Sequence, residues 1–223
     1  MDQPEEAALA VDPSVLPQIM GQVQRTLHQT HFFVKGLCFV PIYAIMWVFI
    51  GKRACLMEYN DIYDKDRNLT GRTHLRGTHW GKGEYGLVVC VWVCDGKGNV
   101  LLTRRAPEKT FPGTWENSGG AVQAGETSLQ AIARELYEET GIQARQEEFQ
   151  LIDTGRDRNA HFDYYLLLRS TPIEEIRLLP GETDGVQWAS FAKVRQMIAQ
   201  KKICRVIARQ FEKQAPMLPG YDL

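Results

Sequence analysis

The chain has 223 residues, of which 44% are hydrophobic and 24% are charged, a composition typical of globular proteins that argues against disorder or a fibrous repeat. Its 26 basic and 27 acidic residues leave a formal net charge of −1, so it lacks the positive excess typical of nucleic-acid-binding proteins. Five scattered cysteines without a CxxC pair favour a reducing, cytoplasmic compartment over a disulfide framework.

Residues 1–56 carry no recognisable motif, and we interpret them as an N-terminal extension or as the product of an upstream start codon. Within them, residues 37–50 are almost wholly apolar but contain Pro41. This run is shorter than the roughly 20 residues that a spanning helix needs. Membrane attachment is therefore the less favoured interpretation of this run. Its apolar face would otherwise be buried against the domain or against a partner chain. The main domain is expected at residues 57–223.

The next segments predict strands, turns and two amphipathic helical regions. Residues 86–94 are rich in β-branched and aromatic residues, which favours a buried strand. A turn at residues 95–99 and a strand at 100–103 would complete a hairpin. A further turn is expected at residues 111–113. The remaining predicted elements are a helix at 127–140 ended by Gly141, strands at 149–154, 162–169 and 185–188, and a helical stretch at 191–214 broken near Lys201. This order suggests an α+β or α/β sandwich.

Three glutamates, Glu135, Glu138 and Glu139, follow the i, i+3, i+4 spacing of one helix face. Carboxylates placed so close together repel one another, so a compensating cation is expected. Their hard oxygen atoms suit Mg²⁺ or Mn²⁺. Ahead of the helix, Gly119 and Gly120 predict a loop that approaches a ligand closely and can lend a carbonyl oxygen to the metal ion. An ordinary solvated helix face is the alternative for such a cluster taken alone.

The spacing of the whole stretch from residue 120 to 142 favours the metal site. It reads G-x5-E-x7-R-E-L-x-E-E-x-G-I, with Gly120, Glu126, Arg134, Glu135, Leu136, Glu138, Glu139, Gly141 and Ile142 in place. At every defined position this pattern resembles the Nudix box. The resemblance implies an α/β/α sandwich with a mixed β-sheet, a loop–helix–loop motif, and hydrolysis of a diphosphate linkage in a nucleoside diphosphate derivative or related small molecule.

The resemblance also implies the roles of individual residues. Glu135, Glu138 and Glu139 would bind Mg²⁺ or Mn²⁺ together with the carbonyl oxygen of Gly120. Arg134 would brace the glutamates by ion pairing, and Glu126 would shape the loop. The general base would be Glu138 or Glu139, or else a glutamate on a later loop. Glu182 is the candidate there, with an ordinary exposed turn residue as the alternative.

Arg104, Arg105 and Lys109 lie before the box and are candidates for binding substrate phosphates, because guanidinium groups match phosphate oxygens. Successive residues of a strand point to opposite faces, so at most one of the two arginines is expected to contact the substrate.

Residues 58–77 resemble the N-terminal segment of Nudix proteins related to isopentenyl diphosphate isomerase. Isomerase chemistry requires a Cys-Gly-His unit, whereas the matching positions here read Gly119, Gly120 and Ala121, so this activity is disfavoured. A non-catalytic nucleotide-binding regulator is the second alternative, and the complete set of box residues argues against it. The sequence leaves open nucleoside triphosphates, nucleotide sugars, dinucleotides, coenzyme-like diphosphates and isoprenoid diphosphates as substrates. A homodimer is expected from the frequency of twofold assemblies.

Overall fold

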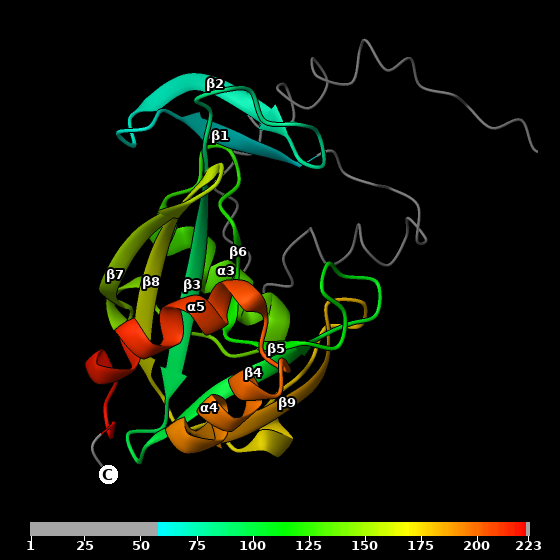
Figure 1. Ribbon diagram of the computed structural model, residues 1–223, viewed down its shortest axis with the longest axis vertical. Helices are drawn as coiled ribbons and strands as arrows, with labels where there is room; N and C mark the ends of the chain where they lie inside the picture. The colour runs from blue at the N-terminus through cyan, green and yellow to red at the C-terminus, as the bar shows by residue number, and fades with distance from the viewer. Residues whose placement is uncertain (1–57, 222–223) are drawn as a thin grey trace, which may run out of the picture. The chain divides into compact units, whose positions relative to one another are not determined.

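The computed structural model describes residues 58–221 (Figure 1). The predicted N-terminal extension and its apolar segment at residues 37–50 lie outside the described residues, so both remain predictions. Within residues 58–221, no helix combines the length and apolar character that are needed to cross a bilayer.

The described chain forms a strand-rich domain with helices late in the sequence. The strands are β1 (Tyr59–Tyr63), β2 (Leu69–Leu75), β3 (Gly86–Cys94), β4 (Asn99–Arg105), β5 (Trp115–Glu116), β6 (Ser118–Ala121), β7 (Gln150–Asp157), β8 (Ala160–Leu168) and β9 (Thr183–Ser190). The helices are α3 (Ser128–Thr140), α4 (Phe191–Ala199) and α5 (Arg205–Gln214), with short 3-10 turns at Gln146–Glu148, Ile173–Glu175 and Ala215–Met217.

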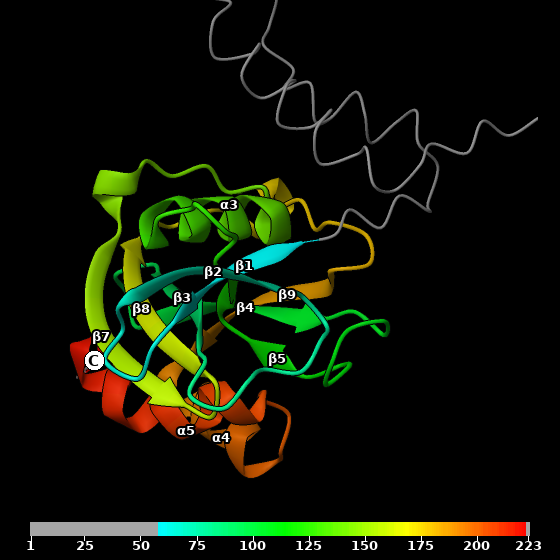
Figure 2. The same cartoon turned by 90° about the horizontal axis from the view of Figure 1, so that it is seen from above.

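Strand β3 is the centre of a mixed sheet. It runs parallel to β8 along its whole length, and β7 pairs antiparallel with β8. The other edge of β3 is shared by β6 and by the beginning of β4, while β4 continues alongside β5 and β9. Helix α3 covers one face of this sheet, and α4 and α5 cover the other (Figure 2). The predicted α/β/α sandwich with a mixed sheet is therefore confirmed.

The uninterrupted apolar sequence of β3 follows from burial on both faces of the sheet. Val89, Val91 and Val93 belong to the core beneath α3, whereas Trp92 and the cysteines Cys90 and Cys94 belong to the core beneath α4 and α5. The indole nitrogen of Trp92 donates a hydrogen bond of 2.8 Å to the buried Gln214 in α5.

Some predicted elements differ from those observed, and others are confirmed. The hairpin between β3 and β4 is paired only at Cys94 and Val100, because β4 then leaves β3 to pair with β9. The predicted break in the last helical stretch is confirmed: α4 ends at Ala199, and Lys201 has a positive φ of 57°. The short strands β5 and β6 were not predicted.

The β1–β2 hairpin lies beyond one end of the central strands (Figure 1) and is anchored to them by polar contacts. Asn60 donates from its side-chain amide to the Val122 carbonyl at 2.8 Å. Arg67, in the hairpin turn, donates to the buried carboxylate of Asp163 in β8 at 2.6 Å. The same carboxylate accepts a hydrogen bond from Ser128 in the first turn of α3 at 2.5 Å. These contacts fix the hairpin and the start of α3 to the same sheet.

Candidate active site

Helix α3 has well-defined ends, which set the direction of its glutamates. Thr127 is the N-cap residue: its hydroxyl accepts a hydrogen bond from the Gln130 backbone, and the Gln130 side chain accepts one from the Thr127 backbone, forming a capping box. Gly141 ends the helix in the left-handed conformation, with a φ of 70°. Leu136, fully buried, packs the helix onto the sheet.

The three glutamates predicted to share one helix face have different environments. The Glu139 residue is only 6% exposed and points into the domain, whereas the side chain of Glu138 is 45% exposed. Glu135 lies between these extremes, with 14% of its side chain exposed. The expectation of a common face is thus only partly correct, since adjacent helical residues are rotated by about 100° from one another. Glu135 and Glu139, one turn apart, face the sheet more fully than Glu138.

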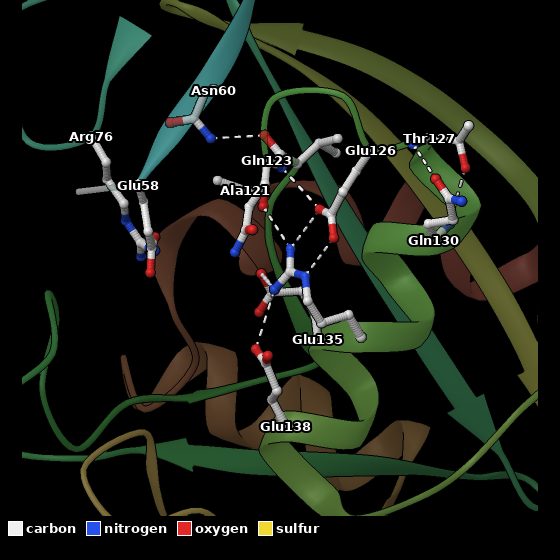
Figure 3. A network of polar contacts seen from close by, with 12 residues as sticks. Glu58, Asn60, Arg76, Ala121, Gln123, Glu126, Thr127, Gln130, Glu135 and Glu138 are labelled. Atoms are coloured by element: carbon white, nitrogen blue, oxygen red, sulfur yellow. Dashed lines mark hydrogen bonds and ion pairs between the residues drawn. The ribbon is translucent and has the colours of Figure 1, made fainter. Parts of the chain in front are cut away.

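Arg134 joins the loop before α3 to the glutamates of the helix. Its partners Glu126, Glu135 and Glu138 lie close to one another (Figure 3). Its guanidinium group binds both carboxylate oxygens of Glu126, at 2.8 and 2.9 Å. A further nitrogen donates to Glu135 at 2.8 Å and to Glu138 at 3.2 Å, and the group also donates to the Ala121 carbonyl at 3.2 Å. This planar fork holds the end of β6, the loop and the helix together.

Gly119 and Gly120 lie in strand β6 rather than in the loop predicted from the sequence. They pair with Cys90 and Val89 of β3. A β-carbon at position 119 would overlap the Val89 carbonyl oxygen, and one at position 120 would overlap the Glu135 carboxylate. Glycine is therefore required at position 119, where backbone blocks a side chain, whereas a side chain at position 120 would displace the Glu135 carboxylate. The sheet register fixes where the Gly120 backbone meets Glu135.

Glu139 is an electrostatically unusual residue. One oxygen of its buried carboxylate has no hydrogen-bond partner. Burial raises the pKa of the Glu139 carboxyl well above its ordinary value, and the neighbouring Glu116 and Glu135 carboxylates raise it further. Burial likewise raises the pKa of Glu135, although Arg134 opposes that rise. A cation beside these groups would relieve both their repulsion and the unpaired oxygen.

The side chains of residues 58–221 do not form a ready-made cage in which three His, Cys, Asp or Glu side chains converge on one point. Arg134 instead engages Glu135 and Glu138. The available donors still fit Mg²⁺ or Mn²⁺: the carboxylate of Glu135 lies between the Gly120 backbone, which it approaches closely, and Glu139 with its unpaired oxygen, on which its charge acts. Magnesium commonly binds proteins through one or two carboxylates and fills its remaining positions with water and substrate phosphate oxygens.

The residues predicted to bind phosphate are engaged in ion pairs. Arg104 binds Asp184 at 2.6 Å, and Arg105 binds Glu116. Lys109 pairs with Glu182, which joins the loop after β4 to the loop before β9. Of the two arginines, Arg105 lines the cleft described below and Arg104 does not.

Glu116, Asn117 and Arg76 were not among the predicted site residues. Glu116 is buried, and burial raises its pKa, which Arg105 opposes. Arg76 pairs with Glu58 in the hairpin (Figure 3). No helical spacing or glycine motif marks these three positions. Only the closeness of Glu116 and Asn117 to Gly119 in the sequence could have drawn attention to those two residues.

A cleft of about 310 Å³ opens beside Gly119 and Gly120. Glu116, Asn117 and Arg105 contribute polar groups to it. Its other walls are largely apolar and come from β3, β8 and the start of α5. The loop before α5 is held at this position because the Cys204 backbone donates to the Trp115 carbonyl at 2.7 Å. The cleft therefore lies beside strand β6 and is large enough for part of a small molecule.

Comparisons with known proteins agree with this geometry. A family model of the NUDIX domain matches residues 84–210, more than half of the chain. A Nudix hydrolase of Listeria monocytogenes is 33% identical over 141 residues, which cover 60% of this chain and 80% of that protein. An isopentenyl-diphosphate Delta-isomerase of an Enterobacter species is 32% identical over 146 residues, covering 62% of this chain and 80% of the relative. A crystal structure from Deinococcus radiodurans, 20% identical, superposes with a TM-score of 0.58 over 69% of this chain and 98% of the other, which shows a shared fold.

The chain therefore belongs to the Nudix family. Within that family its box residues and its hydrolase relatives place it in the class of Nudix-type diphosphate hydrolases.

Proposed function

We propose that the chain hydrolyses a diphosphate linkage in a nucleoside diphosphate derivative or a related small molecule, with Mg²⁺ or Mn²⁺ as the cofactor. The observation that carries this proposal is the unpaired, buried oxygen of Glu139, near the Glu135 carboxylate that approaches Gly120. Glu135, Glu138, Glu139 and the Gly120 carbonyl oxygen are the proposed ligands.

The chemistry follows from the charges that surround the cleft. A bound divalent cation would offset the charge of the phosphate oxygens and lower the pKa of a water molecule. The chain then has to take a proton from that water as it attacks phosphorus. Glu138, the most exposed of the three box glutamates, and Glu182 on the loop before β9 are the proposed bases. Arg105, which lines the cleft, is the proposed phosphate contact.

The relationship to an isomerase makes double-bond migration in an isoprenoid diphosphate the alternative activity. Positions 119–121 provide neither a thiol nor an imidazole, and they read Gly, Gly and Ala. Allylic proton transfer therefore lacks an acid at the place where that enzyme requires one. A small-molecule substrate, a cytoplasmic location and a homodimer are part of the same proposal, and the near-neutral charge disfavours nucleic acid as a partner.

The test is product release from a panel of nucleotide sugars, dinucleotides, nucleoside triphosphates and isopentenyl diphosphate, with Mg²⁺, Mn²⁺ or a chelator. We expect cation-dependent turnover that falls at least about 100-fold in Glu139→Gln, because a metal ligand and a charge are lost together. Glu147→Gln, an exposed position away from the cleft, is the matched control and should retain full turnover.

The same assay distinguishes the two proposed bases. If Glu138 or Glu182 is the base, its replacement by glutamine should lower kcat and remove the acidic limb of the pH–rate profile. If the residue only supports the fold, its replacement should leave that limb in place. Isomerisation of isopentenyl diphosphate, or an absence of turnover on every compound, would refute the proposed hydrolysis.

A further inference from the structure

Asn117 is a buried polar residue whose side chain makes no hydrogen bond. It is 2% exposed and lies between β5 and β6. Among residues 58–221, five buried side-chain nitrogen or oxygen atoms lack a partner, and two of them are the amide nitrogen and oxygen of Asn117. Buried polar groups are nearly always paired, so a side chain with both atoms unpaired calls for a reason other than packing.

The position of Asn117 places it in the cleft but away from the reacting centre. It lines the cleft together with Gly120, which follows three residues later in β6. At about 3.3 Å per extended residue, the two backbones are at most roughly 10 Å apart. Asn117 and Gly120 thus border different parts of one cleft, and a substrate with its phosphates beside Gly120 can place its non-reacting half against Asn117.

The surroundings of Asn117 define what that half must offer. Val88, Phe162 and Ile207 form apolar walls, and Glu116, whose carboxylate is paired with Arg105, also lines the cleft. A side-chain amide presents a donor and an acceptor in one plane. An alkyl chain in this cleft would leave both unpaired, whereas a flat ring with nitrogen and oxygen at its edge satisfies both and buries its faces against the walls.

We propose that Asn117 is a specificity residue, whose side-chain amide hydrogen-bonds the edge of a planar nitrogen-containing ring in the non-reacting half of the substrate. This inference rests on the proposed function and assigns one part of its specificity to a single side chain. It favours ring-bearing diphosphates over isoprenoid diphosphates.

The first experiment compares Asn117→Leu and Asn117→Asp with the unaltered chain. Leucine has nearly the shape of asparagine but offers no polar atom, and aspartate replaces the donor with an acceptor. We expect kcat/KM for a ring-bearing diphosphate to fall at least about 10-fold in Asn117→Leu, chiefly through KM. Its melting temperature should be unchanged or higher, because the folded chain loses no hydrogen bond. A lower melting temperature with unchanged KM would assign Asn117 a structural role and refute the inference.

A second experiment does not depend on turnover. Calorimetry without metal would measure the binding of adenosine, guanosine, cytidine and uridine 5′-monophosphates and of isopentenyl monophosphate. We expect at least one nucleotide to bind, with affinity at least about 10-fold weaker in Asn117→Leu, and we expect isopentenyl monophosphate to bind both chains alike. Binding of no nucleotide, or equal binding to both chains, would refute the inference. Nucleotide binding without hydrolysis would refute only the proposed function.

Discussion

At the scale of single residues, Glu139 and Asn117 have a property in common. Each is almost fully buried, and each carries a polar atom without a partner. Such groups destabilise a folded chain, and proteins tend to retain them at functional sites, where a ligand completes the missing interaction. The metal-free chain should therefore gain stability when such a residue loses its charge or polarity.

Glu139→Gln provides a test in the presence of a chelator. The change replaces a carboxyl group, whose pKa is raised by burial and by the Glu116 and Glu135 carboxylates, with a neutral amide. We expect stabilisation on the order of 1 kcal/mol, as for the relief of one unpaired buried polar group, which corresponds to a rise in melting temperature of about 2–4 °C for a domain of this size. The exposed control Glu147→Gln should leave the melting temperature unchanged. A decrease in Glu139→Gln would show that the carboxylate is already satisfied in the metal-free protein.

Substitution of Arg134 should instead destabilise the chain, because the side chain of Arg134 already has its partners in the folded protein. Arg134→Lys keeps the positive charge but loses the fork that binds Glu126, Glu135 and the Ala121 carbonyl. We expect a loss of about 2 kcal/mol in the free energy of unfolding, measured by urea denaturation, since several partly buried groups lose a partner together. The matched control is Arg145→Lys, whose ion pair with Glu148 is exposed and should contribute little. Equal losses in the two variants would contradict this account.

At the scale of secondary-structure elements, α5 is docked by polar contacts as well as by its apolar face. Gln214 accepts a hydrogen bond from Trp92 in β3 and donates one to Asp153 in β7 at 3.2 Å. Lys213 binds the other oxygen of Asp153 at 2.6 Å. The end of α5 is thereby tied to two strands, and the start of the same helix borders the cleft.

These contacts make the docking of α5 dependent on pH. Burial alone would raise the pKa of Asp153, but the hydrogen bonds from Lys213 and Gln214 outweigh it and hold the pKa below its ordinary value of 3.8. Because the folded pKa is depressed, the stabilisation is present above about pH 3.8 and is lost as the pH falls through the folded value. We expect Asp153→Asn to lower the free energy of unfolding by about 1 kcal/mol at pH 7 and to make no difference near pH 2. Asp157→Asn, with a longer and more exposed ion pair to Arg209, is the control.

The elements that could be predicted from the sequence are those with a clear periodicity. Strand β3 and helix α3 occupy nearly the residues expected, because burial on two faces of a strand and one face of a helix leaves a direct pattern. Strands β5 and β6 were missed. β5 has two residues, and β6 has four that include adjacent glycines, so neither carries such a pattern. Their pairing with β4 and β3, respectively, depends on residues outside these short segments.

At the scale of the whole molecule, the candidate site is assembled from segments far apart in the chain. The box glutamates could be found from their spacing because they share one helix. Glu116 and Asn117 owe their position to β5 and β6, and the wall opposite them comes from residues after Cys204. A single sequence does not show which distant segments meet, so these residues and the ion pairs of Arg104 and Lys109 required the folded structure.

The pairing of Gly120 with Val89 has a further consequence for how this segment tolerates change. Adding one residue to β6 would turn its side chains to the opposite face, and adding one within α3 would rotate Glu139 by about 100° relative to the residues before it. The loop between them is fixed in length as well, because Glu126 must reach Arg134. Between residues 119 and 139, an insertion or deletion should therefore be more harmful than most substitutions. Changes in length are expected instead in loops outside this range.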